Sequence, residues 1–229
     1  MSRHDESGNR NEDSNNRKHD KENLEETVPF YIEKLKEVFY EKKYNIDTFP
    51  TPNIKNERVV NFSYEPTPYS FLEYLFLKYP FSSDDHFVDF GCGKGRTLIM
   101  ASEYSCAYVT GYEINNDIFI ILNNNIMNYK KTSQASSKII LVNQDVSTIS
   151  IDDTMNKFYF ANPFHLKIYI KVIHSILESL KRKPREIYLF LYMPNKSTLE
   201  YLKRIPLFMI KDSESIYGSL PLYIVLTNQ

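Results

Sequence analysis

The residues best suited to chemistry stand in one short stretch, Phe87–Arg96, which reads Phe-Val-Asp-Phe-Gly-Cys-Gly-Lys-Gly-Arg. Its apolar residues and single acid predict a buried strand, and the three alternating glycines predict a tight turn after it. Because glycine has no Cβ and tolerates positive φ, such a turn lets a nucleotide-like ligand lie against bare backbone. The run Thr97–Ala101 predicts a helix whose first N–H groups face the same ligand.

The spacing of the glycines separates several kinds of nucleotide site. A dinucleotide site has glycine at the sixth position of G-x-G-x-x-G, where this chain has Arg96. A phosphate-binding P-loop ends in Gly-Lys-Ser/Thr, but Gly93 and Lys94 are followed here by Gly95. The stretch from Asp89 to Gly95 instead resembles the D-x-G-x-G-x-G signature of class I S-adenosylmethionine-dependent methyltransferases.

The resemblance implies roles for the residues of this motif. Asp89, Gly91 and Gly93 would hold the methionine end of the cofactor, while Arg96 either steadies the turn or meets the carboxylate of the donor. A glycine-rich turn without a ligand is the alternative for an isolated motif. The residues of the motif predicted to bind cofactor are Asp89, Gly91, Cys92, Gly93, Gly95 and Arg96.

Two acids follow the next two predicted strands. A nucleoside ligand needs an acid that accepts hydrogen bonds from its ribose hydroxyls, usually at the tip of the second strand, and Glu113 stands there. In the methyltransferases that the sequence resembles, this acid holds both ribose hydroxyls, and an Asp after the third strand accepts from the adenine amino group. Asp145 matches that Asp, with Val146 packing on adenine. Ile114, beside Glu113, completes this part of the predicted cofactor site.

The fourth predicted strand ends in Asn162-Pro163-Phe164-His165. This resembles the Asn-Pro-Pro-aromatic tetrad of amino-group methyltransferases, with one proline missing. The resemblance implies that the Asn162 side chain, which also borders the cofactor, aims an acceptor nitrogen at the sulfonium methyl while Phe164 packs on the target group. Positioning dominates such an in-line displacement. The missing proline leaves the identity of the acceptor atom open.

Two alternatives remain for this segment. A strand-ending Asn-Pro turn accounts for Asn162 and Pro163 without any acceptor. His165 either removes a proton from the acceptor, because imidazole titrates near neutral pH, or hydrogen-bonds locally at the start of a helix. The residues predicted to be catalytic are Asn162, Pro163, Phe164 and His165.

The elements that must position these residues alternate along the chain. This alternation predicts an α/β fold with a mostly parallel seven-stranded sheet, helices on both faces and an antiparallel C-terminal hairpin. The resemblance implies that this is the Rossmann-like fold of class I methyltransferases. Strands are predicted over residues 87–90, 108–112, 139–142, 158–161, 187–192, 206–210 and 222–226. Helices are predicted over residues 97–101, 115–128, 166–180 and 198–202.

The chain divides into three predicted parts. Residues 1–24 form a polar tail, predicted to be disordered because it cannot bury enough apolar surface. Residues 25–63 form a cap or lid region with an amphipathic helix, which either packs on the domain or covers the ligand. Residues 64–229 form the predicted methyltransferase domain. The apolar stripe of the amphipathic helix consists of Val28, Ile32, Leu35 and Phe39.

The segment Glu65-Pro66-Thr67-Pro68 leads into a further helix, with Thr67 as its cap and Pro68 at its first position. In methyltransferases the corresponding segment often closes over the cofactor, so Tyr64 and Thr67 join the predicted cofactor site, with helix capping as the alternative for Thr67. With its E-P-T-P, D-x-G-x-G-K-G-R and N-P-F motifs, the chain is similar to small bacterial methyltransferases over residues 64–192.

Composition limits the classes of partner. The 229 residues carry a formal net charge of −1, which does not favour nucleic acid or an anionic membrane as partner. No apolar segment follows the first Met, and the longest apolar run, Ile118–Leu122, is too short to span a bilayer, so we expect a soluble cytoplasmic protein. No His/Asp/Glu cluster has ligand spacing, so no metal is expected.

The expected activity is methyl transfer from S-adenosylmethionine to a small molecule or a protein side chain. An RNA or DNA methyltransferase is one alternative, although a basic surface would be expected for it. A scaffold that binds the donor without catalysis is a second alternative. A nicotinamide-dependent oxidoreductase is disfavoured, because Arg96 replaces the third glycine of its motif. The oligomeric state does not follow from the sequence.

Overall fold

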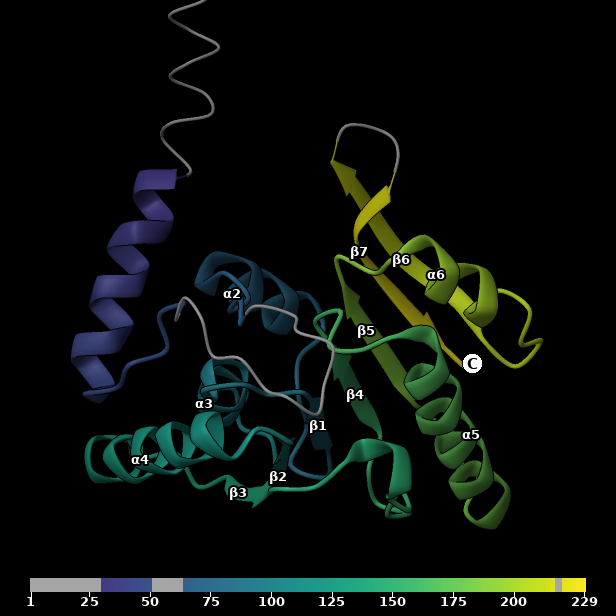
Figure 1. Cartoon of the computed structure of the whole chain (residues 1–229), viewed down its shortest axis with the longest axis horizontal. Coiled ribbons are helices and arrows are strands. Elements are labelled where there is room, and N and C mark those ends of the chain that lie inside the picture. Colours follow the sequence, from purple (N-terminus) through teal and green to yellow (C-terminus); the bar gives the residue numbers. More distant parts are fainter. Residues whose placement is uncertain (1–29, 51–63, 217–219) are drawn as a thin grey trace, which may run out of the picture.

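The computed structural model of the chain describes residues 30–50, 64–216 and 220–229. The tail predicted over residues 1–24, the start of the amphipathic helix at Val28 and the predicted boundaries after residues 24 and 63 lie outside these ranges. The described residues form a seven-stranded sheet in the order β3-β2-β1-β4-β5-β7-β6 (Figure 1). The predicted fold class is therefore confirmed.

Five parallel strands form the part of the sheet that carries the glycine turn. In β1 Asp89 pairs in register with Gly111 of β2 on one side and with Tyr159 of β4 on the other. Each of these strands agrees with the predicted range to within one residue at either end. Their bounds are β1 His86–Phe90, β2 Tyr108–Tyr112, β3 Lys138–Val142, β4 Lys157–Phe160 and β5 Tyr188–Tyr192.

Two further strands close the sheet as an antiparallel hairpin. Strand β7, Leu220–Thr227, lies antiparallel to both β5 and β6, and β6 covers Met209–Ile216. The hairpin is confirmed, but its first strand begins three residues later than the predicted 206–210. Pro206 and Leu207 form a turn there instead.

Helices cover both faces of the sheet and enclose two hydrophobic cores. Figure 1 shows α2, α3 and α4 on one side of the sheet and α5 and α6 on the other. A short 3₁₀ helix, η1, covers Val146–Thr148 after β3. The helix bounds are α2 Tyr69–Lys78, α3 Arg96–Glu103, α4 Asn116–Thr132, α5 Leu166–Arg182 and α6 Lys196–Leu202.

A helix over residues 30–44, drawn in purple in Figure 1, contacts the domain through its acids. The Glu33 carboxylate accepts hydrogen bonds from the backbone N–H groups of Tyr69 and Ser70 at 2.6 and 3.0 Å, at the start of α2. By contrast, Leu35 and Phe39 of the predicted apolar stripe are exposed. The helix therefore contacts the domain through its carboxylates, which turn inward to satisfy N–H groups, and not through the apolar stripe.

Candidate functional site

The glycine turn lies where β1 ends and α3 begins, at the carboxyl edge of the parallel strands. Gly91 has φ +84° and Gly93 has φ +53°, conformations that L side chains rarely adopt. A Cβ on Gly91 would stand 2.7 Å from the Cβ of Pro163, and one on Gly93 would collide with the ring of Tyr64. The turn therefore needs glycine for its conformation and also for its close contacts.

Asp89 is buried inside β1, one strand position before the end. Burial raises its pKa to about 8, with a smaller contribution from the nearby Glu113, and a hydrogen bond with the Thr97 side chain acts in the opposite direction. A carboxyl group in this state retains its proton over much of the neutral range. Asp89 is thus a buried acid whose charge depends on what approaches the turn.

Glu113, at the end of β2, is hydrogen-bonded to the glycine turn. Its Oε2 accepts from the backbone N–H of Gly93 at 3.0 Å, and its Oε1 accepts from that of Asn115 at 2.8 Å. Burial raises the pKa of Glu113, while these backbone hydrogen bonds lower it. Each carboxylate oxygen has a second lone pair, so Glu113 can also accept from a ligand hydroxyl. Ile114 follows it and is exposed.

Asp145 stands at the end of the neighbouring strand β3, as predicted, and caps η1. Its Oδ1 accepts from the backbone N–H of Ser147 at 2.8 Å. The side-chain amide of Asn143 donates to the backbone carbonyl of Glu113 at 2.9 Å, which ties the ends of β2 and β3 together. Val146 is half-buried against the core on the α5 side of the sheet.

Tyr64 lies directly over the glycine turn, against Gly93. Its hydroxyl donates to the backbone carbonyl of Thr48 at 3.2 Å, and the Lys94 ammonium lies 5.6 Å from its ring centroid. Burial raises the pKa of this phenol. The structure therefore brings Tyr64 to the predicted site as an aromatic cover.

Thr67 is buried, but it does not cap the helix that follows. Pro68 occupies the N-cap position of α2, whereas the Thr67 hydroxyl is hydrogen-bonded to the hydroxyl of Tyr159 in β4 at 2.8 Å. The capping interpretation of Thr67 and the placement of Pro68 as the first helical residue are both wrong. Glu33 of the helix over residues 30–44 supplies the acceptor for the α2 N–H groups instead.

Arg96, the first residue of α3, is buried and fully hydrogen-bonded within the protein. Its Nε donates to the Thr48 hydroxyl at 2.8 Å, Nη1 to the Thr67 carbonyl at 3.2 Å and Nη2 to the Thr48 carbonyl at 3.3 Å. Both Nη atoms also donate to Glu37 at 3.4 Å, and Glu41 lies 3.6 Å from Nη2. These contacts use all five guanidinium donors.

Arg96 therefore steadies the turn, and the expectation that it meets the carboxylate of the donor is not supported, because no donor remains for a ligand. Its guanidinium also stacks 4.2 Å from the ring centroid of Tyr69. Cys92 likewise turns its side chain inward, toward Gly111 of β2. Only the backbone of Cys92 can face a ligand at the turn.

Asn162 lies two residues after the end of β4 and has φ +48°, an uncommon conformation for a residue other than glycine. Its Oδ1 accepts from the side-chain amide of Asn195 at 3.2 Å. Pro163 packs against Gly91, so this segment borders the glycine turn. The structure thus brings Asn162 and Pro163 to the turn.

Phe164 and His165 occupy different environments from Asn162. The Phe164 ring is buried, 4.6 Å from the ring centroid of Tyr169 in α5, so the expectation that it packs on an acceptor group is not supported. Burial of this apolar ring in the core removes it from water, which stabilises the fold. His165 is exposed at the N-cap position of α5 and lines a depression of about 540 Å³ together with Asn195.

The partners of Arg96 were not predicted from the sequence. Glu33, Glu37 and Glu41 recur every four residues, so they share one face of their helix. That acidic stripe was a signal that this face meets cations or helix N-termini. The contact of Asn195 with Asn162 was not predicted either. The position of Asn195 just after the fifth strand was the signal that it lies at the same edge of the sheet.

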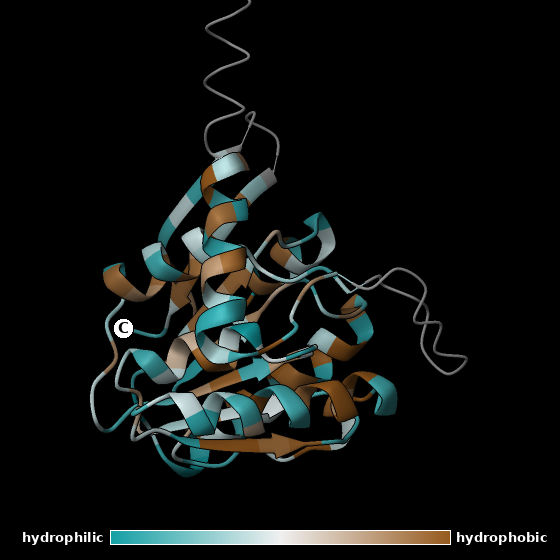
Figure 2. Cartoon of the chain, turned by 90° about the vertical axis from the view of Figure 1, so that its left-hand side faces the viewer, coloured by the Kyte–Doolittle hydropathy of each residue, from teal (hydrophilic) through white to brown (hydrophobic). Residues whose placement is uncertain are grey.

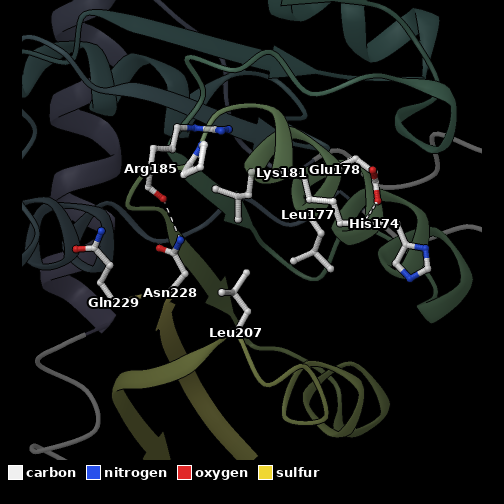
Figure 3. A pocket seen from close by; sticks show the side chains of 10 residues that line it. His174, Leu177, Glu178, Lys181, Arg185, Leu207, Asn228 and Gln229 are labelled. Carbon is white, nitrogen blue, oxygen red and sulfur yellow. Dashed lines mark hydrogen bonds and ion pairs between the residues drawn. The ribbon is translucent and has the colours of Figure 1, made fainter.

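A cavity of about 680 Å³ lies at the C-terminal end of α5 (Figure 3). Glu178 and Lys181 form an ion pair of 2.6 Å at its edge, and the Asn228 amide donates to the carbonyl of Arg185 at 2.9 Å. Because α5 runs antiparallel to the strands, this cavity lies at the edge of the sheet opposite the glycine turn. It is separate from the candidate site.

Within residues 30–50, 64–216 and 220–229 no three His, Cys, Asp or Glu side chains gather as a metal site would require. Among the helices of the same residues, none is long and apolar enough to cross a membrane.

Comparison with protein-family models gives no match for this chain, and comparison with curated proteins also gives none. Solved structures do match. A Streptococcus mutans protein assigned as a methyltransferase, solved with S-adenosylhomocysteine, has a TM-score of 0.53 at 13% identity, covering 71% of this chain and 99% of that one. A Clostridium thermocellum protein assigned as an rRNA methylase has a TM-score of 0.53 at 15% identity, covering 71% and 96%.

A third match is an S-adenosylmethionine-dependent O-methyltransferase from Thermotoga maritima, with a TM-score of 0.52 at 14% identity, covering 71% of this chain and 66% of that one. The chain has the Rossmann-like fold of methyltransferases. At such low identity the likeness shows this fold alone. One of these proteins is assigned as an rRNA methylase and another as an O-methyltransferase, so the likeness does not select an acceptor for this chain.

Proposed function

We propose that this protein is a methyltransferase that uses S-adenosylmethionine. The observation that carries the proposal is the hydrogen bond from the backbone of Gly93 to Glu113, which joins a bare glycine turn to a buried acid at the end of β2. Such an arrangement suits a nucleoside ligand, because backbone can face its linker while the acid accepts from its ribose hydroxyls. The fold shared with methyltransferases supports the same ligand.

The residues around the turn fit the parts of this cofactor. Glu113 would accept from the two ribose hydroxyls through its remaining lone pairs. Asp145 would accept from the adenine amino group, with Val146 beside the ring. Asp89 and the glycine backbone would hold the methionine end. When bound, the cofactor supplies a methyl group on a positively charged sulfur.

The position of the Tyr64 ring affects how a ligand would bind at the turn. Because its ring already rests on Gly93, a ligand at the turn must stack on this ring or displace it. An aromatic face also attracts cations, so the ring would favour a sulfonium group. Tyr64 would therefore cover the cofactor and exclude water from the reacting atoms.

The acceptor would bind on the Asn162 side of the turn. The Asn162 amide lies just after the end of β4, and its hydrogen bond with Asn195 fixes its orientation. An amide held in this way can accept a hydrogen bond from an amine and aim the nitrogen lone pair, which suits transfer by positioning. We propose a nitrogen of a small molecule or protein side chain as the acceptor, in a cytoplasmic setting. His165 lines the same depression as Asn195, the partner of Asn162, and would accept the proton that the nitrogen releases.

Calorimetric titration with S-adenosylhomocysteine tests the cofactor assignment. We expect the wild type to bind and Glu113→Ala to bind at least tenfold more weakly, a loss of about 1.4 kcal/mol. Asp84→Ala is the control, because Asp84 is an exposed acid before β1 at the opposite edge of the sheet. It removes the same charge and should leave affinity unchanged.

A wild type that binds no S-adenosylhomocysteine would contradict the proposal, and NADH would then be the next titrant. Binding without turnover would instead indicate a scaffold that holds the donor. Incubation with methyl-labelled S-adenosylmethionine and separate pools of amines, peptides and RNA distinguishes these results. We expect label in the amine or peptide pool and its loss in Asn162→Ala.

A further inference from the structure

The outer face of the helix over residues 30–44 is apolar and exposed. Its five large apolar side chains are between 46% and 71% exposed. Figure 2, which faces this side of the molecule, shows hydrophobic bands along the helix. These side chains are Tyr31, Ile32, Leu35, Val38 and Phe39. Phe30 is also exposed, but it shares a side of the helix with Glu33 and Glu37.

Polar contacts fix the orientation of this helix, so its apolar face cannot simply rotate inward. Glu33 is bound to the start of α2, and Glu37 lies 3.4 Å from the Arg96 guanidinium. Lys36, on the flank, forms an ion pair with Glu73 of α2. Rotation of the helix would leave buried charges without partners, which costs several kcal/mol. The outward stripe is therefore a lasting feature of the surface.

The size of the stripe suits association. An aromatic side chain has roughly 150–250 Å² of surface and an aliphatic one has less, so five side chains that are about half exposed present on the order of 500 Å². Monomers rarely expose a contiguous apolar patch of more than a few hundred Å². Two such faces together would bury about 1,000 Å², near the smallest area expected of a specific protein–protein interface.

The distribution of these residues suits a second copy of the same chain. Tyr31 precedes Leu35 by four positions, while Val38 and Phe39 follow it by three and four. In two copies packed antiparallel with Leu35 at the centre, Tyr31 of each copy would lie against Val38 and Phe39 of the other. A two-fold interface requires such self-complementarity.

Charge also favours a second copy over a lipid surface. Lys34 within the face is paired with Glu37 at 2.7 Å, so it brings no unpaired charge into a dimer. An anionic membrane attracts clusters of free basic residues. Here Lys43 already lies 3.6 Å from Glu103, and the formal net charge of the chain is −1.

We infer that the protein forms a two-fold dimer through the outer face of the helix over residues 30–44, with Leu35 of each copy at the axis. Sedimentation equilibrium of the full chain should give a monomer–dimer equilibrium. Leu35→Glu should raise the dimer dissociation constant at least tenfold, because it places two like charges together. Leu77→Glu is a matched control, since Leu77 in α2 is also a leucine with 71% exposure and should leave the equilibrium unchanged.

A covalent test is independent of the change in charge. Leu35→Cys should form a disulfide-linked dimer under mild oxidation, because residues on a two-fold axis meet their own copies, whereas Leu77→Cys should form no disulfide-linked dimer. Cys92 and Cys106 are buried and should not interfere. Circular dichroism confirms that each variant is folded.

A wild type that stays monomeric at high concentration would overturn the inference, as would a dimer that Leu35→Glu leaves intact. Co-sedimentation of the monomer with anionic vesicles would assign the face to a membrane and overturn it too. None of these results bears on the binding of S-adenosylhomocysteine.

Discussion

Arg96 joins three parts of the chain that are far apart in sequence. It begins α3, yet it donates to Thr48 and Thr67 and pairs with Glu37 of the N-terminal helix. Removal of a buried charge with this many partners would leave its hydrogen-bond acceptors unpaired inside the protein. The conformation of the glycine turn thus depends on residues that do not themselves touch a ligand.

Substitution of Arg96 tests this dependence. We expect Arg96→Met to lower the free energy of unfolding by about 3–5 kcal/mol, because it leaves Glu41 buried without a cation and leaves Glu37 with Lys34 alone. Arg96→Met combined with Glu37→Gln and Glu41→Gln should recover part of the loss. Arg182→Met is the control: Arg182 pairs with Asp153 at the surface, so its loss should cost less than about 1 kcal/mol. Urea denaturation measures all three, and equal losses at Arg96 and Arg182 would contradict the argument.

Asp89 gives the protein a predictable dependence on pH. Burial raises its folded-state pKa to about 8, whereas the unfolded chain releases this proton near the ordinary value of 3.8. The stabilisation from the protonated form is therefore complete below the ordinary value and is lost as the pH rises toward 8. We expect the free energy of unfolding of the wild type to fall relative to that of Asp89→Asn between about pH 5 and 8. Parallel urea curves for the two proteins across this range would refute the prediction.

At the scale of elements, the start of α2 is held by an acid from another helix. Glu33 accepts from two backbone N–H groups that would otherwise have no intrahelical partner. We expect Glu33→Ala to cost about 0.5–2 kcal/mol, the range for loss of an N-cap. Lys42→Ala, at an exposed position of the helix over residues 30–44, should change the free energy of unfolding little. Thermal unfolding followed by circular dichroism provides the comparison, and an unchanged midpoint for Glu33→Ala would show that water replaces the carboxylate.

The elements were predictable from sequence where local pattern determines them. Strands β1 to β5 are short apolar runs bounded by turn residues, and the position of Glu113 follows directly from the end of one of them. The role of Arg96 was not predictable, because its partners Glu37 and Thr48 lie 59 and 48 residues away. Leu35 shows a second limit. Amphipathic spacing defines two faces of a helix, but the partners available in the fold decide which face packs inward.

At the scale of the whole molecule, the N-terminal helix connects the surface to the candidate site. Its outer face is the proposed dimer interface, and its inner face holds Arg96, one residue after the glycine turn. The sheet separates the helix over residues 30–44 and the glycine turn from the hydrophobic core that α5 covers. Binding at the turn should therefore affect one side of the molecule more than the other.

Hydrogen exchange with and without S-adenosylhomocysteine tests this coupling. Ligand at one hundred times its dissociation constant stabilises the folded state by about 2.7 kcal/mol, and the gain is shared by segments that open together. We expect slower exchange in the glycine turn and in the helix over residues 30–44, with the C-terminal half of α5 as the unaffected reference. Arg96→Lys keeps the charge but loses the planar fork that binds several acceptors at once. In this variant we expect the ligand to slow exchange at the glycine turn but no longer in the helix over residues 30–44. Protection confined to the turn in the wild type would show that Arg96 stabilises the two elements without coupling them.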